Sequence, residues 1–153
     1  MSNFDPDQFL DSTTTEASVK RPPLPAGLDL VATITNIKAG AWQGKKDPTQ
    51  SGVKFDVSLE FDLTSHHDLH KQIGADKVTI VDTIMLETTE AGHIDFGPGK
   101  NAKLRRYREA LGMNVPGESF SARAMVGRLI KAKIKHDPYE GEIYDKIDSV
   151  AKA

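Results

Sequence analysis

The sequence feature that most constrains the fold is a strict alternation of apolar and polar residues between Val53 and Leu63 (VKFDVSLEFDL). Successive side chains of a β-strand point to opposite faces of a sheet, so this spacing predicts a strand with one buried and one solvated face. Phe55 and Phe61 fall on the buried face and are predicted to lie in the core. The outward face carries mostly acids, which argues against a polyanion lying across all of it, and Lys54 is its one favourable residue.

A second alternating pattern lies near the end of the chain, in Ala124–Val150, and predicts two strands joined by a turn. Its first strand places three aliphatic residues toward the core and a row of lysines outward: Ile130, Ala132 and Ile134 against Lys131, Lys133 and Lys135. The predicted turn, Asp137–Gly141, carries Tyr139, and Tyr144 follows in the second strand. Cations beside exposed aromatic rings are typical of surfaces that bind single-stranded nucleic acid. The alternative is a solvated basic hairpin.

The remaining patterns predict strands at Leu28–Lys38 and Lys77–Glu87 and a helix at Asn101–Met113. Three strands, a helix and two further strands are the element order of an OB-fold. We therefore expect a mainly β domain, a five-stranded OB-fold barrel with one helix between strands 3 and 4. A β-sandwich is the runner-up, although it would need more strands in this length.

A long loop is predicted between the first two strands, at Ala39–Gly52, and it holds the only tryptophan, Trp42. Lys45 and Lys46 follow in the same loop. Two interpretations stay open. Trp42 folds back onto the edge of the barrel, or it stacks a base beside the two lysines.

The N-terminal residues differ in composition from the rest of the chain. Met1–Ser18 holds four acids and no base, and three prolines follow between residues 22 and 25. Prolines favour extended backbone, and this segment has too few apolar residues for a core of its own. We expect an extended, partly disordered acidic and proline-rich arm at residues 1–26, and the OB-fold domain at residues 27–153. The arm can dock on its own domain or join copies into a homo-oligomer.

Composition excludes several classes of protein. The chain has no cysteine, which removes disulfides and thiolate chemistry and is compatible with a reducing cytoplasm. It has neither a secretory signal nor an apolar run long enough for a membrane helix, so we expect a cytoplasmic protein with no membrane partner. The net charge of −2 hides a basic stretch at residues 97–136.

The catalytic and metal motifs considered are missing or incomplete. Gly97–Lys100 lacks the remainder of a phosphate-binding loop, and there is no nucleophile elbow or zinc-protease motif. His66, His67 and His70 lie in a predicted loop with no remote ligand set, so they are interpreted as incidental. We expect no enzyme activity, no metal and no cofactor. A hydrolase is the least favoured function.

Two acids conflict with strict alternation. Asp82 and Asp145 share the phase of buried residues in their predicted strands. Either a bulge shifts the register, or each acid has a buried partner.

Several segments together resemble phage-encoded single-stranded DNA-binding proteins of OB-fold type. The resemblance covers roughly residues 24–150, and it rests on these motifs: Leu24–Gly27 before a strand, Ser51-Gly52 before the long alternating strand, Leu104–Gly112 (LRRYREALG), Met125–Arg128, and Tyr139–Tyr144. It implies a non-enzymatic protein that coats single strands during replication or recombination, with cations and aromatics on the barrel face and its loops. The chain departs from the acidic C-terminal tail of many such proteins, because it ends in Ser149–Ala153.

The expected function is sequence-tolerant binding of single-stranded DNA, with RNA left open, in phage replication or recombination and hence in the host cytoplasm. The expected contacts are Trp42, Lys45, Lys46, Lys54, Lys131, Lys133, Lys135, Tyr139 and Tyr144. The alternative is a phage structural or accessory module whose N-terminal arm drives assembly.

Overall fold

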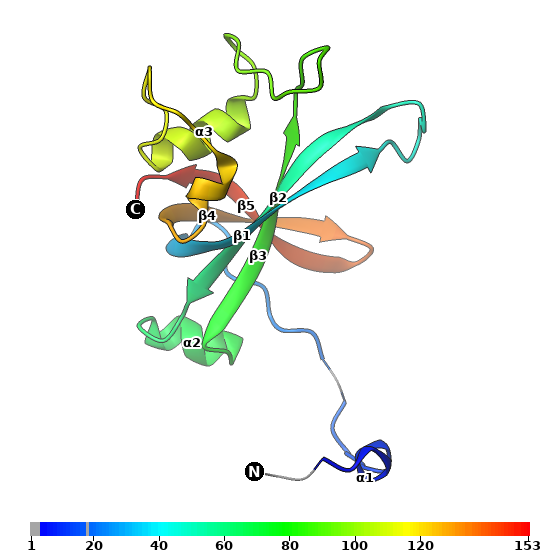
Figure 1. Ribbon diagram of the computed structural model, residues 1–153. Helices are drawn as coiled ribbons and strands as arrows, with labels where there is room; N and C mark the ends of the chain where they lie inside the picture. Colours follow the sequence, from blue (N-terminus) through cyan, green and yellow to red (C-terminus); the bar gives the residue numbers. More distant parts are fainter. Residues whose placement is uncertain (1–3, 18) are drawn as a thin grey trace.

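The computed structural model describes residues 4–17 and 19–153, and its centre is one antiparallel five-stranded sheet (Figure 1). The strand order across the sheet is β3-β2-β1-β4-β5. The prediction of a mainly β domain is therefore confirmed. The strands are β1 (Asp29–Gln43), β2 (Ser51–Asp62), β3 (Lys77–Leu86), β4 (Leu129–Tyr139) and β5 (Glu142–Ala151).

The predicted OB-fold barrel is not confirmed, because the sheet does not close. Its edge strands, β3 and β5, approach each other without pairing. Helix α3 (Ala102–Ala110) follows β3 as predicted and contacts both edges. Lys103 and Tyr107 of α3 hydrogen-bond the Asp82 carboxylate of β3. Helix side chains thus bridge an opening that backbone hydrogen bonds leave unclosed.

The core lies between the inner face of the sheet and the helices that cover it. The inner rows of β2 and β4 are buried as their alternation predicted: Val57, Leu59 and Phe61, and Ile130, Ala132 and Ile134. Leu104 and Tyr107 reach the core from α3, and Met125 reaches it from the 3-10 helix η1 (Ala122–Met125). Phe55 is only partly buried, because it lies on the end of β2 that extends past the core.

Both hairpins have longer strands and shorter turns than predicted. Pairing of β1 with β2 continues to Gln43 and Ser51, so Trp42 lies in a strand. The loop predicted at Ala39–Gly52 is wrong at both ends and is confined to residues 44–50. Ala39–Ala41 has weak β-propensity, but an established ladder carries such residues along. In the other hairpin Tyr139 pairs with Glu142, and Glu140 and Gly141 form the turn with φ of 50° and 79°. Two positive φ angles are what a two-residue hairpin turn needs.

A helix, α2 (His67–Ile73), stands where a polar loop was predicted. The sequence prediction fails because only Leu69 and Ile73 pack against the core, too few for a recognisable helical period. Gly74 ends the helix in the left-handed conformation, with φ of 77°. His70 Nε2 lies 2.7 Å from Asp76 Oδ1. Among the described residues, no group of three potential ligands could hold a metal ion, and no helix is long and apolar enough to cross a membrane.

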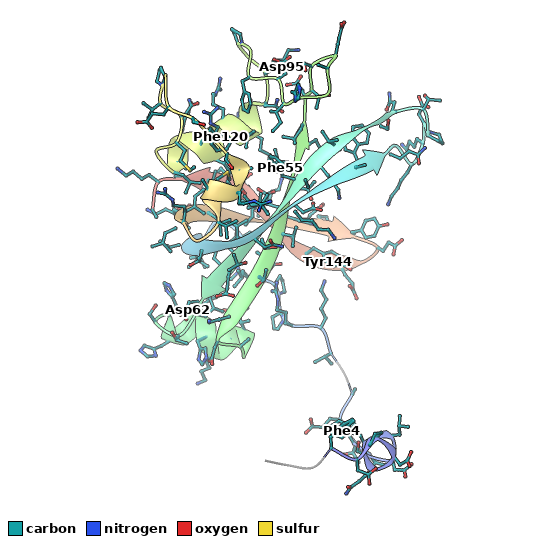
Figure 2. All side chains as sticks on the ribbon, in the orientation of Figure 1. Phe4, Phe55, Asp62, Asp95, Phe120 and Tyr144 are labelled. Carbon is teal, nitrogen blue, oxygen red and sulfur yellow. The ribbon has the colours of Figure 1, made fainter. Side chains whose placement is uncertain are left out.

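The segment predicted as an extended arm contains a short helix and a docked end. Helix α1 (Pro6–Leu10) lies away from the sheet (Figure 2). At the other end Leu24 is fully buried in the core, and its carbonyl oxygen lies 2.7 Å from His136 Nε2. The proline-rich end of the arm is therefore packed on the domain. Residues 1–3 and Ser18 lie outside the described residues.

Asp82 and Asp145 keep the phase that strict alternation gave them, and each has a partner. Asp82 is bonded by Lys103 Nζ at 2.8 Å and by the Tyr107 hydroxyl. Asp145 accepts two hydrogen bonds from Arg21, at 2.7 and 3.1 Å, and one from the Leu24 N–H at 2.8 Å. Burial raises the pKa of Asp145, but these hydrogen bonds outweigh it and hold that pKa below its ordinary value.

Candidate nucleic-acid interface

The lysine row of β4, Lys131, Lys133 and Lys135, lies on the outer face of the sheet. All three side chains are exposed, and they alternate with the buried Ile130, Ala132 and Ile134. Among the described residues none of the three forms an ion pair, although Lys133 is directly opposite Asp29 on β1. Lys135 faces Lys146 on β5, which adds positive charge. These cations are available to phosphates.

The tip of the β4–β5 hairpin presents one free ring and one covered ring. Tyr139, the last residue of β4, is 60% exposed. Lys20 lies over the ring of Tyr144, with Nζ 3.2 Å from the centroid, so one face of that ring is occupied. The Tyr144 hydroxyl donates to Glu142 Oε2 at 3.0 Å, and this bond raises the pKa of Tyr144. Of the two tyrosines, Tyr139 is the better stacking platform.

The β1–β2 hairpin holds its predicted site residues in more constrained positions. Trp42 pairs with Gly52, and its ring lies directly over that glycine: a Cβ at Gly52 would come within 2.7 Å of Trp42 Nε1. The ring therefore packs within its own hairpin, and its Nε1 is buried without a hydrogen-bond partner in the described structure. Lys54 Nζ lies 3.3 Å from Asp56 Oδ2, so its charge is paired.

In the turn of that hairpin, the two lysines are exposed and unpaired with any described residue, unlike Lys54 in its second strand. Lys45 and Lys46 are exposed and form no ion pair with any described residue. Asp56, beside Lys54, accepts a 2.6 Å hydrogen bond from Thr83 Oγ1. This bond lowers the pKa of Asp56 and keeps its carboxylate charged on the outer face.

The predicted site residues fall into two groups, one on each hairpin, and both hairpins project to the same side in Figure 1.

A third surface, which the sequence patterns did not reveal, combines phenylalanines and arginines. We call it the phenylalanine–arginine hollow: Phe55, Phe96, Arg108, Phe120 and Arg123. It is open to solvent, with a volume of about 590 Å³, and Phe55, Phe96, Phe120 and Arg123 line it. That volume lies within the roughly 300–1,000 Å³ of sites that take small ligands. Phe96 and Phe120 meet edge to face with ring centroids 6.3 Å apart.

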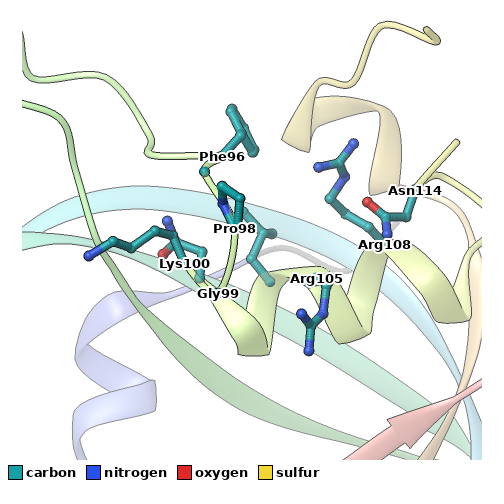
Figure 3. Close-up of a pocket in the computed structure, with 10 residues that line it drawn as sticks. Phe96, Pro98, Gly99, Lys100, Arg105, Arg108 and Asn114 are labelled. Carbon is teal, nitrogen blue, oxygen red and sulfur yellow. The ribbon is translucent and has the colours of Figure 1, made fainter. Parts of the chain in front are cut away.

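Arg108 of α3 lies over two of the three rings of this surface. Its guanidinium carbon is 4.3 Å from the Phe120 ring centroid and 5.3 Å from that of Phe96. Its Nε donates to the Met113 carbonyl at 3.3 Å, and Figure 3 shows the side chain beside Phe96 and Asn114 in an adjoining pocket. Neither Arg108 nor Arg123 forms an ion pair with a described residue.

Little in the sequence could have predicted the hollow. Phe55 shares the phase of the core residues, and Phe96 and Phe120 lie in turn-rich segments without periodicity. Arg108 lies on a helix whose basic residues look like a solvated face. One feature of the sequence could have indicated it: the apolar row of β2 begins before the part of the strand that the core covers, which leaves Phe55 partly exposed.

The cluster around Asp82 joins α3 to the sheet, and Lys135 of the lysine row lines the same small cavity. Burial and the nearby Asp82 charge raise the pKa of Tyr107, so its hydroxyl stays protonated and donates to the carboxylate. Lys103 Nζ also donates to the Thr83 carbonyl at 2.9 Å. These bonds fasten α3 to the β3 edge of the sheet.

Comparison with known proteins adds no family. The sequence matches no protein-family model and has no significant match among curated proteins.

Proposed function

We propose that this protein binds single-stranded DNA with little sequence preference, in the manner of phage-encoded proteins that coat single strands during replication or recombination. The observation that carries the proposal is the lysine row of β4, which is exposed and without ion pairs among the described residues. The exposed ring of Tyr139 follows on the same strand, beyond Asp137. Lysines neutralise phosphates and release their counterions, and an aromatic ring stacks any of the four bases.

The arrangement of the sheet supports the same proposal. The order β3-β2-β1-β4-β5, with α3 between β3 and β4, is compatible with an OB-fold in which β3 and β5 have not paired. OB-type domains bind oligonucleotides with the loops after strands 1 and 4 flanking the site. In this chain Lys45 and Lys46 lie in the first of these connections, and Tyr139 ends β4 directly before the second.

Binding of a fluorescently labelled dT oligonucleotide, followed by anisotropy, tests the proposal. Unlabelled competitors of equal length give the specificity: single-stranded DNA of mixed sequence should compete as well as oligo-dT, and duplex DNA should compete poorly. An RNA competitor measures the preference between DNA and RNA. Duplex competing as well as single strands, or no binding at low salt, would contradict the proposal.

A further inference from the structure

Helix α1 is specified by its own local sequence. The Asp5 carboxylate accepts hydrogen bonds from the N–H groups of Asp7 and Gln8, at 3.1 and 3.4 Å, and Pro6 occupies the first turn. Phe4 and Phe9 pack across the start of the helix with centroids 5.1 Å apart. This is an N-cap combined with a hydrophobic staple, the arrangement that fixes a helix start without help from a distant core.

The apolar residues that this helix gathers have no partner on the described part of the chain. Phe4, Phe9 and Leu10 are 69%, 68% and 83% exposed. Clustered exposed apolar residues on a soluble protein mark contact sites. Asp5, Asp7 and Asp11 surround them, so the complementary surface should be apolar and basic.

The phenylalanine–arginine hollow has that complementary character. Phe55, Phe96 and Phe120 give it an aromatic lining, and Phe96 is 58% exposed. Arg108 and Arg123 bring charges that no described carboxylate neutralises. One acid lies near the rim, Asp95, whose Oδ1 accepts the Gly97 N–H at 2.9 Å.

Within one chain the two surfaces are apart. Figure 2 shows Phe4 at one end of the molecule and Phe120 toward the other. Lys20 is held over Tyr144 and Arg21 is bonded to Asp145, so the arm leaves the domain at the β4–β5 hairpin. Helix α1 therefore projects away from its own hollow, and both surfaces are open to a second molecule.

We infer that helix α1 of one copy docks in the phenylalanine–arginine hollow of a second copy. Phe4 and Phe9 pack against the aromatic lining, and the carboxylates around them pair with Arg108 and Arg123. The two surfaces differ, so the contact is head-to-tail and adds copies one after another unless a ring closes. This inference goes beyond the proposed DNA binding and does not depend on it.

Complementation between two damaged copies tests the inference. One variant, Phe4→Ala/Phe9→Ala, keeps the hollow and loses the docking residues. The other, Arg123→Glu, keeps α1 and reverses a charge in the hollow. Lys71→Glu, an exposed cation on α2, is the control with the same change of net charge. Masses are measured by sedimentation over a range of concentrations, without DNA, after circular dichroism has established that each variant folds.

The wild type and Lys71→Glu should associate with rising concentration, and each damaged variant should associate at least tenfold more weakly. An equimolar mixture of the two damaged variants should form heterodimers and nothing larger, because it contains one intact α1 and one intact hollow. A mixture that stays monomeric would overturn the inference, and so would a monomeric wild type. The inference would also be overturned if Arg123→Glu weakened oligo-dT binding and left association unchanged, because the hollow would then bind DNA and not a second copy.

Discussion

The two hairpins carry the same kinds of residue, yet the fold leaves them in different states. On the β4–β5 hairpin the cations of the lysine row lack ion pairs among the described residues and Tyr139 is exposed. On the β1–β2 hairpin Trp42 lies over Gly52, and Lys54 is paired with Asp56. Residue type alone therefore overestimates how well the β1–β2 hairpin can bind a polyanion. What matters for a polyanion is which charges and rings are still without partners.

The largest effect should follow from removing the lysine row. In Lys131→Ala/Lys133→Ala/Lys135→Ala, affinity for oligo-dT at low salt should fall on the order of a hundredfold, because three phosphate contacts and their counterion release are lost. Anisotropy at fixed salt measures the change. The matched control is Lys71→Ala/Lys77→Ala/Lys100→Ala, which removes equal charge from α2, the start of β3 and the segment before α3, and should cost much less.

Tyr139→Ala should have the next largest effect on binding. Losing one stacked base should reduce the binding free energy for oligo-dT by about 1–3 kcal/mol. The Tyr139→Phe variant is the control, since it keeps the ring and should bind as the wild type does. Equal affinity for the wild type and the alanine variant would show that the exposed ring takes no part.

Arg21→Ala tests how the arm supports the β4–β5 hairpin. Removing the charged donor from the half-buried Asp145 should lower the free energy of unfolding by about 1–3 kcal/mol at neutral pH. Urea unfolding of both proteins measures this difference.

The same pair of proteins should show a defined pH dependence. The folded pKa of Asp145 lies below its unfolded value, so this contribution is present above the unfolded pKa of about 4. It is lost as pH falls through the folded pKa, where the carboxyl becomes protonated in both states. The difference between wild type and Arg21→Ala should therefore narrow below about pH 4. A difference that stays constant with pH would assign the effect to packing.

The smallest effect on binding should come from Trp42→Ala. One face of the ring already covers Gly52 and is not available to a base. We therefore expect Trp42→Ala to lose less binding free energy than the roughly 1 kcal/mol at the lower end of the range for a stacked base. It should still exceed the loss for Phe61→Ala in a folded protein, because Phe61 is buried in the core. If Trp42→Ala costs more than Tyr139→Ala, the ranking of the two hairpins is reversed.

Period-two alternation predicted the core strands because burial on one face is a local property of the sequence. It placed Phe61 and the inner row of β4 correctly. The bonds of Asp82 and Asp145 were not predictable in detail, because their partners lie 21 to 25 and 121 to 124 residues away.

The site was predictable only where it follows a single strand. The lysine row needs nothing but the phase of β4. The state of Trp42 depends on which residue stands opposite it, and the hollow needs β2, α3 and two turn-rich segments to meet. The cross-strand partner of Trp42 depends on strand register, and the hollow depends on tertiary contacts between distant segments. Neither leaves a local period in the sequence.

The most direct test of the central claim is the salt dependence of oligo-dT binding by the wild type and by the variant without the lysine row. For the wild type the logarithm of the association constant should fall linearly with the logarithm of salt concentration. Each lost phosphate contact on single-stranded DNA should remove about 0.7 from the slope, so the variant should be shallower by about 2. Equal slopes for the two proteins, or binding independent of salt, would contradict the assignment of the lysine row to DNA.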